Sequence, residues 1–385
     1  TRATTAELFD GLIAHSQNCW PSVKFDALAV NDAASDFLAA GFYYKTFMWP
    51  ASFWEKVYEP IIRRAAGLGA LSMQEDPDQY DKGFRHCDLL IVGAGPSGLM
   101  AALTAGRAGK EVILADEDFA LGGRLLSEQL DVGGKSAFDW TTQTVAELSS
   151  MTNVRLMTRT TVIGAFDHGI YGAVERVSDH LLEPEAGKPR QILWRIYASK
   201  TLLCAGAIER PIAFENNDRP GIMLASAMRA YVNRWAATPA KRVAIFTSCD
   251  DGHRTAADLH AKGVKIAAVI DTRDDAPMSM EYEVLAGAQV INTKGRLGLT
   301  FVEVKLADGS DRTLECGALG VSGGWNPNLH LTCHQRGRPT WNADLSAFVP
   351  GGTLPPGMSV AGAATGDLST HGALLSGANG AAEAL

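Results

Sequence analysis

The sequence contains no CxxC pair, although it has six cysteines. Their wide separation along the chain argues against a disulfide framework, a zinc ribbon and a thioredoxin-like dithiol centre. Scattered cysteines of this kind are typical of a reducing compartment, so we expect a cytoplasmic protein. The six are Cys19, Cys87, Cys204, Cys249, Cys316 and Cys333.

The sequence also lacks clusters of Lys or Arg and long apolar runs. Its formal net charge is −8, so we expect neither nucleic acid nor an anionic membrane as a partner. No apolar run reaches the roughly 18 residues that a membrane span requires. The chain starts at Thr1 without a signal-peptide pattern and stops inside a helix-like segment. We therefore expect it to be part of a longer polypeptide.

At 385 residues the chain is longer than one hydrophobic core usually supports, which predicts two domains or one split domain. Residues 1–86 are rich in aromatic residues and helix formers and are expected to form an N-terminal extension. Strand-like and helical patterns then alternate, as in a parallel α/β sheet. The alternation predicts a split domain of residues 87–239 plus 326–385, into which the tail strand "MSVAGAA" returns, and a second domain of residues 240–325.

One segment carries a complete nucleotide-binding pattern. An apolar strand ends at Val92, Gly93-Ala-Gly95-Pro-Ser-Gly98 fits GxGxxG, and a helical pattern follows. The three glycines permit a tight turn, a close approach of a pyrophosphate and close packing of helix on strand, in that order. The free N–H groups at the start of the helix favour phosphates. Replacing Gly95 with valine is therefore expected to remove the nucleotide and to destabilise the fold.

The residues after this helix extend the pattern. The second strand ends at Asp116-Glu117, where a carboxylate can accept hydrogen bonds from adenosine ribose hydroxyls, at about the expected spacing of ~20 residues. An acid there favours an unphosphorylated ribose, hence NAD or FAD over NADP. Gly122-Gly123-Arg124 follows. This pair of glycines lets a second loop approach the phosphates, and Arg124 can pair with them; the alternative is a surface turn with a solvated Arg.

A second strand–turn–helix pattern lacks the glycines. In "RVAIFTSCDDGHRTAADL" the turn has one glycine, and Asp250 and Asp251 stand where a pyrophosphate would be repelled. The pattern predicts a degenerate nucleotide site. We expect Asp250 or Asp251 to cap the helix, in preference to a metal site that also uses His253. The segment 271–275 after the next strand is expected to be a solvated turn.

The remaining residues form no catalytic or metal-binding pattern. No Ser/His/Asp, paired-carboxylate or His/Cys metal constellation can be recognised, so we predict no catalytic residue and no metal ligand. The surroundings of Cys204 and Cys249 do not lower a thiol pKa. One N-terminal stretch is unusually aromatic, which indicates packing in a core or between domains, or else a partner-subunit surface; it contains Phe42, Tyr43, Tyr44, Phe47, Trp49, Phe53, Trp54 and Tyr58.

The chain resembles the two-dinucleotide-binding flavoprotein superfamily in "VGAGPSG", "GGRLL", "TLLCAGAIERP" and "MSVAGAATG". More closely, it resembles the alpha-subunit family of heterotetrameric sarcosine oxidase, in "AHSQNCWPSVKFDALAVND", "GFYYKTFMWPASFWEKVYEP", "RAAGLG" and "GVSGGWNPNLHL". The resemblance covers nearly the whole chain. It implies an α/β, Rossmann-like two-dinucleotide-binding fold with a helical N-terminal extension.

The resemblance also implies a function. Alpha subunits of this family hold NAD, and the beta subunit holds FAD and oxidises sarcosine. FMN lies near the alpha–beta interface and passes electrons to oxygen, which gives hydrogen peroxide. Gamma and delta subunits complete the tetramer, and a C-terminal alpha domain uses tetrahydrofolate. That domain and an N-terminal iron–sulfur-like domain have no counterpart in this sequence, so the chain alone is expected to be inactive.

The resemblance places the cofactor residues on this sequence. FAD-binding members generally have Gly-Asp in the late strand, and Gly362-Ala363 stands here, which favours NAD because alanine cannot accept those hydrogen bonds; Asp367 in a shifted loop is the alternative. An autonomous NAD(P)H-dependent flavoprotein reductase and a structural subunit with an empty pocket remain as alternative functions. The expected cofactor-binding residues are Gly93, Gly95, Pro96, Ser97, Gly98, Asp116, Glu117, Gly122, Gly123, Arg124, Val162, Ala205, Gly206, Gly362 and Ala363.

Overall fold

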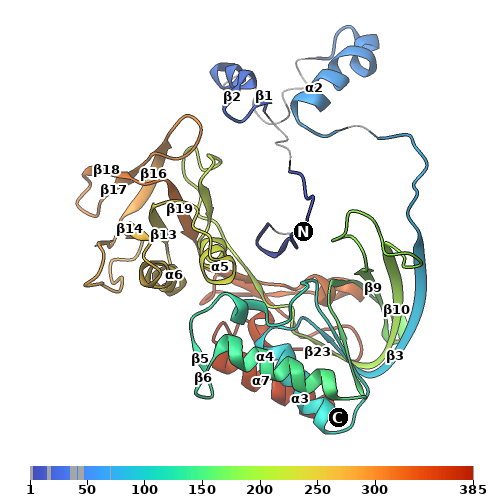
Figure 1. Cartoon of the computed structure of the whole chain (residues 1–385). Helices are drawn as coiled ribbons and strands as arrows, with labels where there is room; N and C mark the ends of the chain where they lie inside the picture. The colour runs from blue at the N-terminus through green and yellow to red at the C-terminus, as the bar shows by residue number, and fades with distance from the viewer. Residues whose placement is uncertain (1–2, 15–18, 35–40, 42–46, 70, 385) are drawn as a thin grey trace. The chain divides into compact units, whose positions relative to one another are not determined.

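The computed structural model describes residues 3–14, 19–34, 41, 47–69 and 71–384. It divides into two units, one of Thr1–Leu8 with Asp78–Leu385 and one of Phe9–Pro77. Figure 1 shows the elements of each unit. All of the predicted cofactor-binding residues lie in the first unit.

The larger sheet of the first unit has seven strands. Its order is β7 (Val154–Met157), β4 (Val112–Ala115), β3 (Tyr80–Val92), β10 (Gln191–Leu203), β9 (Ile170–Arg176) and β8 (Thr160–Phe166), and β23 (Met358–Val360) also pairs with β10. β7, β4, β3, β10 and β23 run parallel, whereas β9 pairs antiparallel with both β10 and β8. The long strand β10 therefore changes partner along its length, from β9 to β23.

The core lies on both faces of this sheet. Along β3, Leu89 and Ile91 belong to one buried cluster and Leu90 and Val92 to another. Alternate side chains therefore point into two separate cores, as expected for a parallel sheet that is covered on both faces. This explains why the strand reads as a continuous apolar run.

Three helices pack on one face of the sheet: α3 (Pro96–Arg107), α4 (Ala137–Ser150) and α7 (Thr370–Ala384). Figure 1 shows them side by side. A β-carbon added at Gly377 of α7 would lie 2.1 Å from the carbonyl oxygen of Ser97. The small residues of the closing helix therefore serve its close approach to α3.

A second sheet carries the other strand–helix alternation. Its parallel strands are β12 (Ile222–Leu224), β19 (Ala318–Ser322), β13 (Arg242–Thr247), β14 (Lys265–Asp271) and β15 (Val284–Leu285). Helices α5 (Ala225–Trp235) and α6 (Asp250–Ala261) pack on it. A three-stranded antiparallel sheet of β16 (Gln289–Lys294), β17 (Phe301–Lys305) and β18 (Asp311–Glu315) follows.

Short elements connect these layers. The predicted boundary at residue 86 lies inside β3. β12 pairs with the second sheet and α5 packs on it, although both elements precede the predicted boundary at residue 240. The remaining elements of the first unit are η1 (Ala3–Thr5), η5 (Gly123–Leu126), β5 (Asp131–Val132), β6 (Lys135–Ser136), η6 (Asp167–Gly169), β11 (Ala207–Glu209), β20 (Trp325–Pro327), η7 (His330–Arg336), β21 (Thr340–Asn342), β22 (Ala347–Val349) and η8 (Gly362–Thr365). The predicted domain boundaries stay a prediction.

The unit Phe9–Pro77 contains β1 (Pro21–Ser22), β2 (Phe25–Asp26), η2 (Ala27–Ala34), η3 (Ala51–Phe53), the π-helix η4 (Trp54–Tyr58) and α2 (Glu59–Ala65). None of its described residues is buried, and Trp49 is 85% exposed. No described aromatic residue is buried within this unit. Packing between domains and a partner-subunit surface stay predictions. Three of the aromatic residues in these predictions, Phe42, Tyr43 and Tyr44, lie outside the described residues.

Candidate dinucleotide-binding site

The first glycine loop forms the tight turn that its sequence predicts. β3 ends at Val92, and Gly93 follows with a φ of +100°, a conformation that favours glycine. A β-carbon at Gly93 would also lie 2.4 Å from the carbonyl oxygen of Cys204. A side chain at Gly98 would lie 1.9 Å from the carbonyl oxygen of Gly93. Both glycines are therefore required by the protein's own packing.

Gly95 differs from these two glycines. Its φ is −70°, and a β-carbon placed on it would have no protein atom within 4 Å. The open space lies at the start of α3, where no side chain caps the helix. Gly95 is thus required by nothing in the fold and leaves its backbone accessible to a ligand. The expectation that Gly95→Val destabilises the fold is therefore not supported by the structure.

The second glycine pair lies against the first loop. The Gly122 N–H donates to the carbonyl oxygen of Ala94 at 2.9 Å. A β-carbon at Gly123 would lie 2.8 Å from the α-carbon of Gly95. The structure therefore brings both predicted glycine loops to one place.

Arg124 has protein partners of its own. Its Nε donates to Glu128 at 2.6 Å, and its Nη1 donates to the carbonyl oxygen of Leu368 at 2.8 Å. Its guanidinium also lies 5.9 Å from the centre of the Trp325 ring. The side chain borders the cavity described below, but these bonds hold it in place without a phosphate.

Asp116 stands at the end of β4, beside the first loop. One carboxylate oxygen accepts from the Ala94 N–H at 2.6 Å, and the other accepts from the Asp118 N–H at 2.8 Å. Burial raises the pKa of Asp116 to about 6, although the two backbone donors oppose this shift. Each carboxylate oxygen has a second lone pair, with which it can accept a ribose hydroxyl.

These groups border one cavity of about 540 Å³. Of the predicted residues, Gly98, Gly122 and Gly362 do not line it, and their role is in the packing of the loops. The predicted residues that line it are Gly93, Gly95, Pro96, Ser97, Asp116, Glu117, Gly123, Arg124, Val162, Ala205, Gly206 and Ala363.

The sequence did not predict the residues that α5 and the amino-terminal segment contribute to this cavity. Helix α5 contributes Arg229 and Arg234, and the first unit's amino-terminal segment contributes Thr4. Arg234 forms a bidentate pair with Asp118 at 2.7 and 2.9 Å. No motif marks these residues, because each acts through a partner far away in the sequence.

The late strand carries no carboxylate into the cavity. Ala363 lines it, in the short helix η8 that follows β23. Asp367, the alternative acceptor, bonds to the N–H and the hydroxyl of Ser369 at 3.0 and 2.8 Å. It is absent from the cavity lining. Its carboxylate thus stabilises the turn before α7.

The second turn is built differently from the expected helix cap. Cys249 is the N-cap of α6, and no side chain caps the helix. Asp251 is 4% exposed and accepts from Arg229 at 2.6 Å, while Asp250 accepts from Arg273 at 2.9 Å. The prediction that an aspartate caps this helix is therefore wrong, because both carboxylates are bound by arginines instead.

The carboxyl end of β14, beside this turn, is also occupied by side chains of the protein. Asp271 is fully buried, and His253 contacts it at 2.7 Å. Arg273 donates to Asp271 from its backbone at 2.9 Å and from its guanidinium at 2.8 Å. The prediction of a solvated turn is therefore wrong for Asp271. Among the described residues, no group of three His, Cys, Asp or Glu side chains is placed to hold a metal ion.

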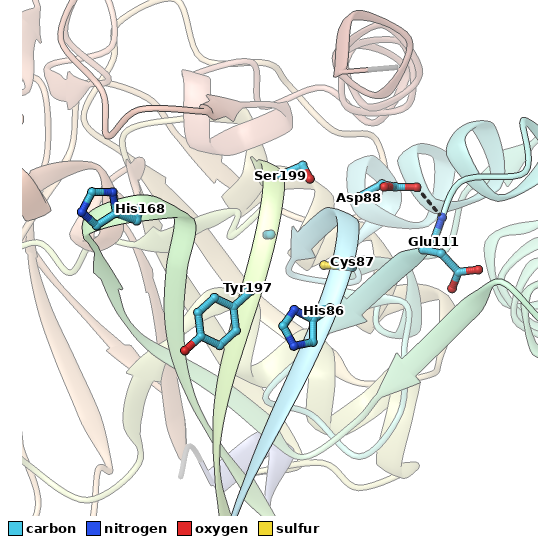
Figure 2. A pocket seen from close by; sticks show the side chains of 8 residues that line it. His86, Cys87, Asp88, Glu111, His168, Tyr197 and Ser199 are labelled. Carbon is cyan, nitrogen blue, oxygen red and sulfur yellow. Dashed lines mark hydrogen bonds between the residues drawn. The ribbon is translucent and has the colours of Figure 1, made fainter.

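A second hollow, of about 500 Å³, lies elsewhere on the larger sheet. Figure 2 shows His86 and Tyr197 side by side there, with ring centres 5.0 Å apart. Asp88 accepts from the Glu111 N–H at 3.1 Å. None of the predicted cofactor-binding residues lines this hollow.

Known proteins match this chain in sequence. A model of FAD-dependent oxidoreductases matches residues 88–185. Sarcosine oxidase subunit alpha of Rhizobium meliloti (strain 1021) is 50% identical over 366 residues, which cover 94% of this chain and 37% of the relative. This chain is homologous to sarcosine oxidase alpha subunits. Subunit alpha of Corynebacterium sp. (strain P-1) is 40% identical over 329 residues, 81% of this chain and 34% of the relative. The chain thus spans about a third of the length of these curated relatives.

Solved structures show the fold. L-proline dehydrogenase from P. horikoshii superposes with a TM-score of 0.62 at 20% identity, over 81% of this chain and 57% of that chain. Thioredoxin reductase from Lactococcus lactis (FR conformation) gives 0.60 at 14% identity, over 77% of this chain and 97% of that chain. The prediction of an α/β two-dinucleotide-binding, Rossmann-like fold is confirmed. No helix among the described residues has the length and apolar character to cross a membrane.

Proposed function

We propose that this chain is the dinucleotide-binding portion of the alpha subunit of heterotetrameric sarcosine oxidase, and that it holds NAD without cycling it. One observation carries the proposal. The first turn has open space above Gly95, whereas the two aspartates of the second turn are paired with Arg229 of α5 and with Arg273, which follows β14. The scaffold therefore has room for one dinucleotide at a glycine loop.

The residues of the first site fit NAD. The free N–H groups at the start of α3 face the open space beside Gly95 and suit a pyrophosphate. Asp116 suits an unphosphorylated adenosine ribose, because a ribose phosphate would be repelled by its carboxylate. Ala363 offers no acceptor for the ribityl chain of a flavin. NAD supplies hydride chemistry only when a reaction partner stacks on its nicotinamide ring, and we propose that it has none here.

The alternative is an autonomous NAD(P)H-dependent flavoprotein reductase, which needs a second nucleotide at the turn after β13. There Asp250 and Asp251 are each bound by an arginine. A pyrophosphate would have to displace these pairs and would leave two carboxylates beside its own charges. The structure therefore favours the first proposal.

We extend the proposal to the whole complex through the relatives. The complete enzyme would oxidatively demethylate sarcosine to glycine in the cytoplasm and reduce oxygen to hydrogen peroxide. The beta subunit would carry FAD and the substrate, FMN would lie near the alpha–beta interface, and gamma and delta subunits would complete the assembly. Tetrahydrofolate would act in a further alpha domain. This chain contributes a bound dinucleotide and no catalytic side chain.

Identification of the bound nucleotide tests this function. The full chain is purified, denatured, and the released small molecules are separated by chromatography. We expect stoichiometric NAD and no flavin, and no oxidation of added NADH by an artificial electron acceptor. Release of FAD together with NADH turnover would instead establish the reductase. A protein that releases no nucleotide would leave only a structural role.

A further inference from the structure

The amino-terminal segment of the first unit borders the dinucleotide cavity. Thr4 lines the cavity together with Asp116, Glu117 and Asp118, the acids at the end of β4. These acids mark the end of the cavity that suits the adenosine ribose. Thr4 therefore forms part of the wall at that end, although its segment, Ala3–Leu8, carries no nucleotide-binding motif.

One contact ties this segment to α5. The indole N–H of Trp235 donates to the carbonyl oxygen of Thr4 at 2.8 Å. The Trp235 ring is held in turn by Arg234, whose guanidinium lies 4.9 Å from its centre. Arg234 also binds Asp118. The position of Thr4 is thus coupled, through two side chains, to an acid of the cavity wall.

A second contact ties it to the larger sheet. Arg159 forms a bidentate pair with Glu7, with Nε and Nη2 at 2.7 and 2.6 Å from the two carboxylate oxygens. The hydrogen bond from Arg159 lowers the pKa of Glu7, so the pair stays charged at neutral pH. Arg159 has a φ of +52°, and its N–H donates to the carbonyl oxygen of Asp118 at 2.8 Å. The turn between β7 and β8 therefore presents this guanidinium beside the ribose end of the cavity.

The segment has little regular structure of its own. Its only regular element is the three-residue turn η1, and Leu8 is 72% exposed. A single 3₁₀ turn is not stable by itself. The bonds to Trp235 and Arg159 therefore tie the segment to α5 and to the turn after β7.

We propose that Ala3–Leu8 is a retaining strap of the dinucleotide site, which closes the adenosine end and slows release of the bound dinucleotide. This inference rests on the proposed function only in requiring that a dinucleotide binds in the cavity. Thr4 is the wall residue, and Glu7, Arg159 and Trp235 are positioning residues. A strap of this kind suits a dinucleotide that is held and not exchanged.

Exchange of labelled NAD tests the strap. The full chain is loaded with adenine-labelled NAD and diluted into excess unlabelled NAD, and the loss of label is followed. Glu7→Gln loses a bidentate charged pair, and we expect its NAD exchange to be about tenfold faster. Trp235→Phe loses one neutral hydrogen bond, and we expect its NAD exchange to be about threefold faster. The thermal unfolding of the nucleotide-free variants should match that of the unchanged chain, which separates retention from stability.

Glu147→Gln is the matched control. It removes a bidentate pair of the same chemistry, Glu147 with Arg107 at 2.7 and 2.9 Å, from an exposed site outside the cavity lining. Its exchange rate should equal that of the unchanged chain. Equal rates in Glu7→Gln, Trp235→Phe and Glu147→Gln would overturn the strap while leaving the proposed function intact. An unchanged chain that binds no dinucleotide at all would overturn both.

Discussion

The two strand–turn–helix units of this chain start alike and differ at the turn. In each, one glycine lets the helix pack on its strand: a β-carbon at Gly98 would meet the carbonyl oxygen of Gly93 at 1.9 Å, and one at Gly252 would meet the β-carbon of Thr247 at 2.4 Å. In the turn between strand and helix, a glycine with open space above it is found after β3, at Gly95, and not after β13, where Gly252 is the one glycine. The glycine that folding requires is thus present in both turns, whereas the glycine that a ligand requires is present in one.

The second turn also contains a buried carboxylate, which forms an ion pair with an arginine of α5. Arg229 and Asp251 are 3% and 4% exposed, and they pair at 2.6 Å. A buried pair is costly to break because the remaining charge is left without solvent or partner. The second turn therefore contributes to the fold, and the first turn contributes a site.

Breaking the buried pair should have the largest effect on stability. Arg229→Met leaves the Asp251 carboxylate buried without its main donor, and we expect a loss of about 3–5 kcal/mol in the free energy of unfolding by denaturant titration. The double variant Arg229→Met/Asp251→Leu should recover part of this loss, since it also removes the Asp251 carboxylate, and Glu128, 3.8 Å from Arg229, keeps its bond from Arg124. A loss below about 1 kcal/mol in the single variant would show that the second turn does not depend on this pair.

Gly95→Val should weaken dinucleotide binding without changing the stability of the fold. Because its β-carbon meets no protein atom within 4 Å, the free energy of unfolding of the nucleotide-free protein should change little. The side chain fills the space beside the start of α3, so the dinucleotide content after purification should fall about a hundredfold, as for removal of several charge-assisted bonds.

Gly352→Val is the control for this change. Gly352 also has no atom within 4 Å of an added β-carbon, and it lies outside the cavity lining. Its dinucleotide content should match that of the unchanged chain. Full dinucleotide content in Gly95→Val would show that the first loop does not hold the phosphates.

The smallest expected effect is a pH dependence of dinucleotide affinity. The pKa of Asp116 in the folded protein, about 6, lies above its ordinary value of 3.8. The carboxyl is therefore protonated below about pH 6. It also lowers the free energy of unfolding as the pH rises between these two values. Ribose hydroxyls prefer the ionised form as acceptor. Affinity measured by titration calorimetry should therefore be constant above about pH 7 and weaken about tenfold at pH 5.

Asp116→Asn removes this titration. The affinity of the variant should be lower at neutral pH and should not change between pH 5 and 7. A pH profile that is the same in the variant and in the unchanged chain would assign the titration to another group.

Local patterns predicted the parts of the site that depend on neighbouring residues. Gly93, Gly95 and Asp116 come together because a strand, a turn and a helix place them within one βαβ unit, and the sequence contains all three elements. Thr4, Arg229 and Arg234 could not be predicted in this way. Their partners lie far away in the sequence, and no spacing rule connects them.

The second turn also shows that local patterns do not predict contacts between residues far apart in the sequence. The sequence shows that its glycines are missing, which predicts a turn without a phosphate cradle. Composition then suggested that Asp250 or Asp251 caps α6, because aspartate is a good capping residue. The structure instead pairs both with arginines from other elements. For Asp251, which is buried, a local preference of about 1 kcal/mol is outweighed because its charge needs a partner.

The sequence by itself determined the fold class and the position of one glycine loop, because hydrophobic alternation and glycine spacing act over a few residues. Tertiary structure decided the rest. It brought a second glycine pair against Gly95, it closed the second turn with Arg229 and Arg273, and it placed Thr4 in the wall of the cavity. These arrangements depend on contacts between residues far apart in the chain, whose energies exist only once the sheets have formed.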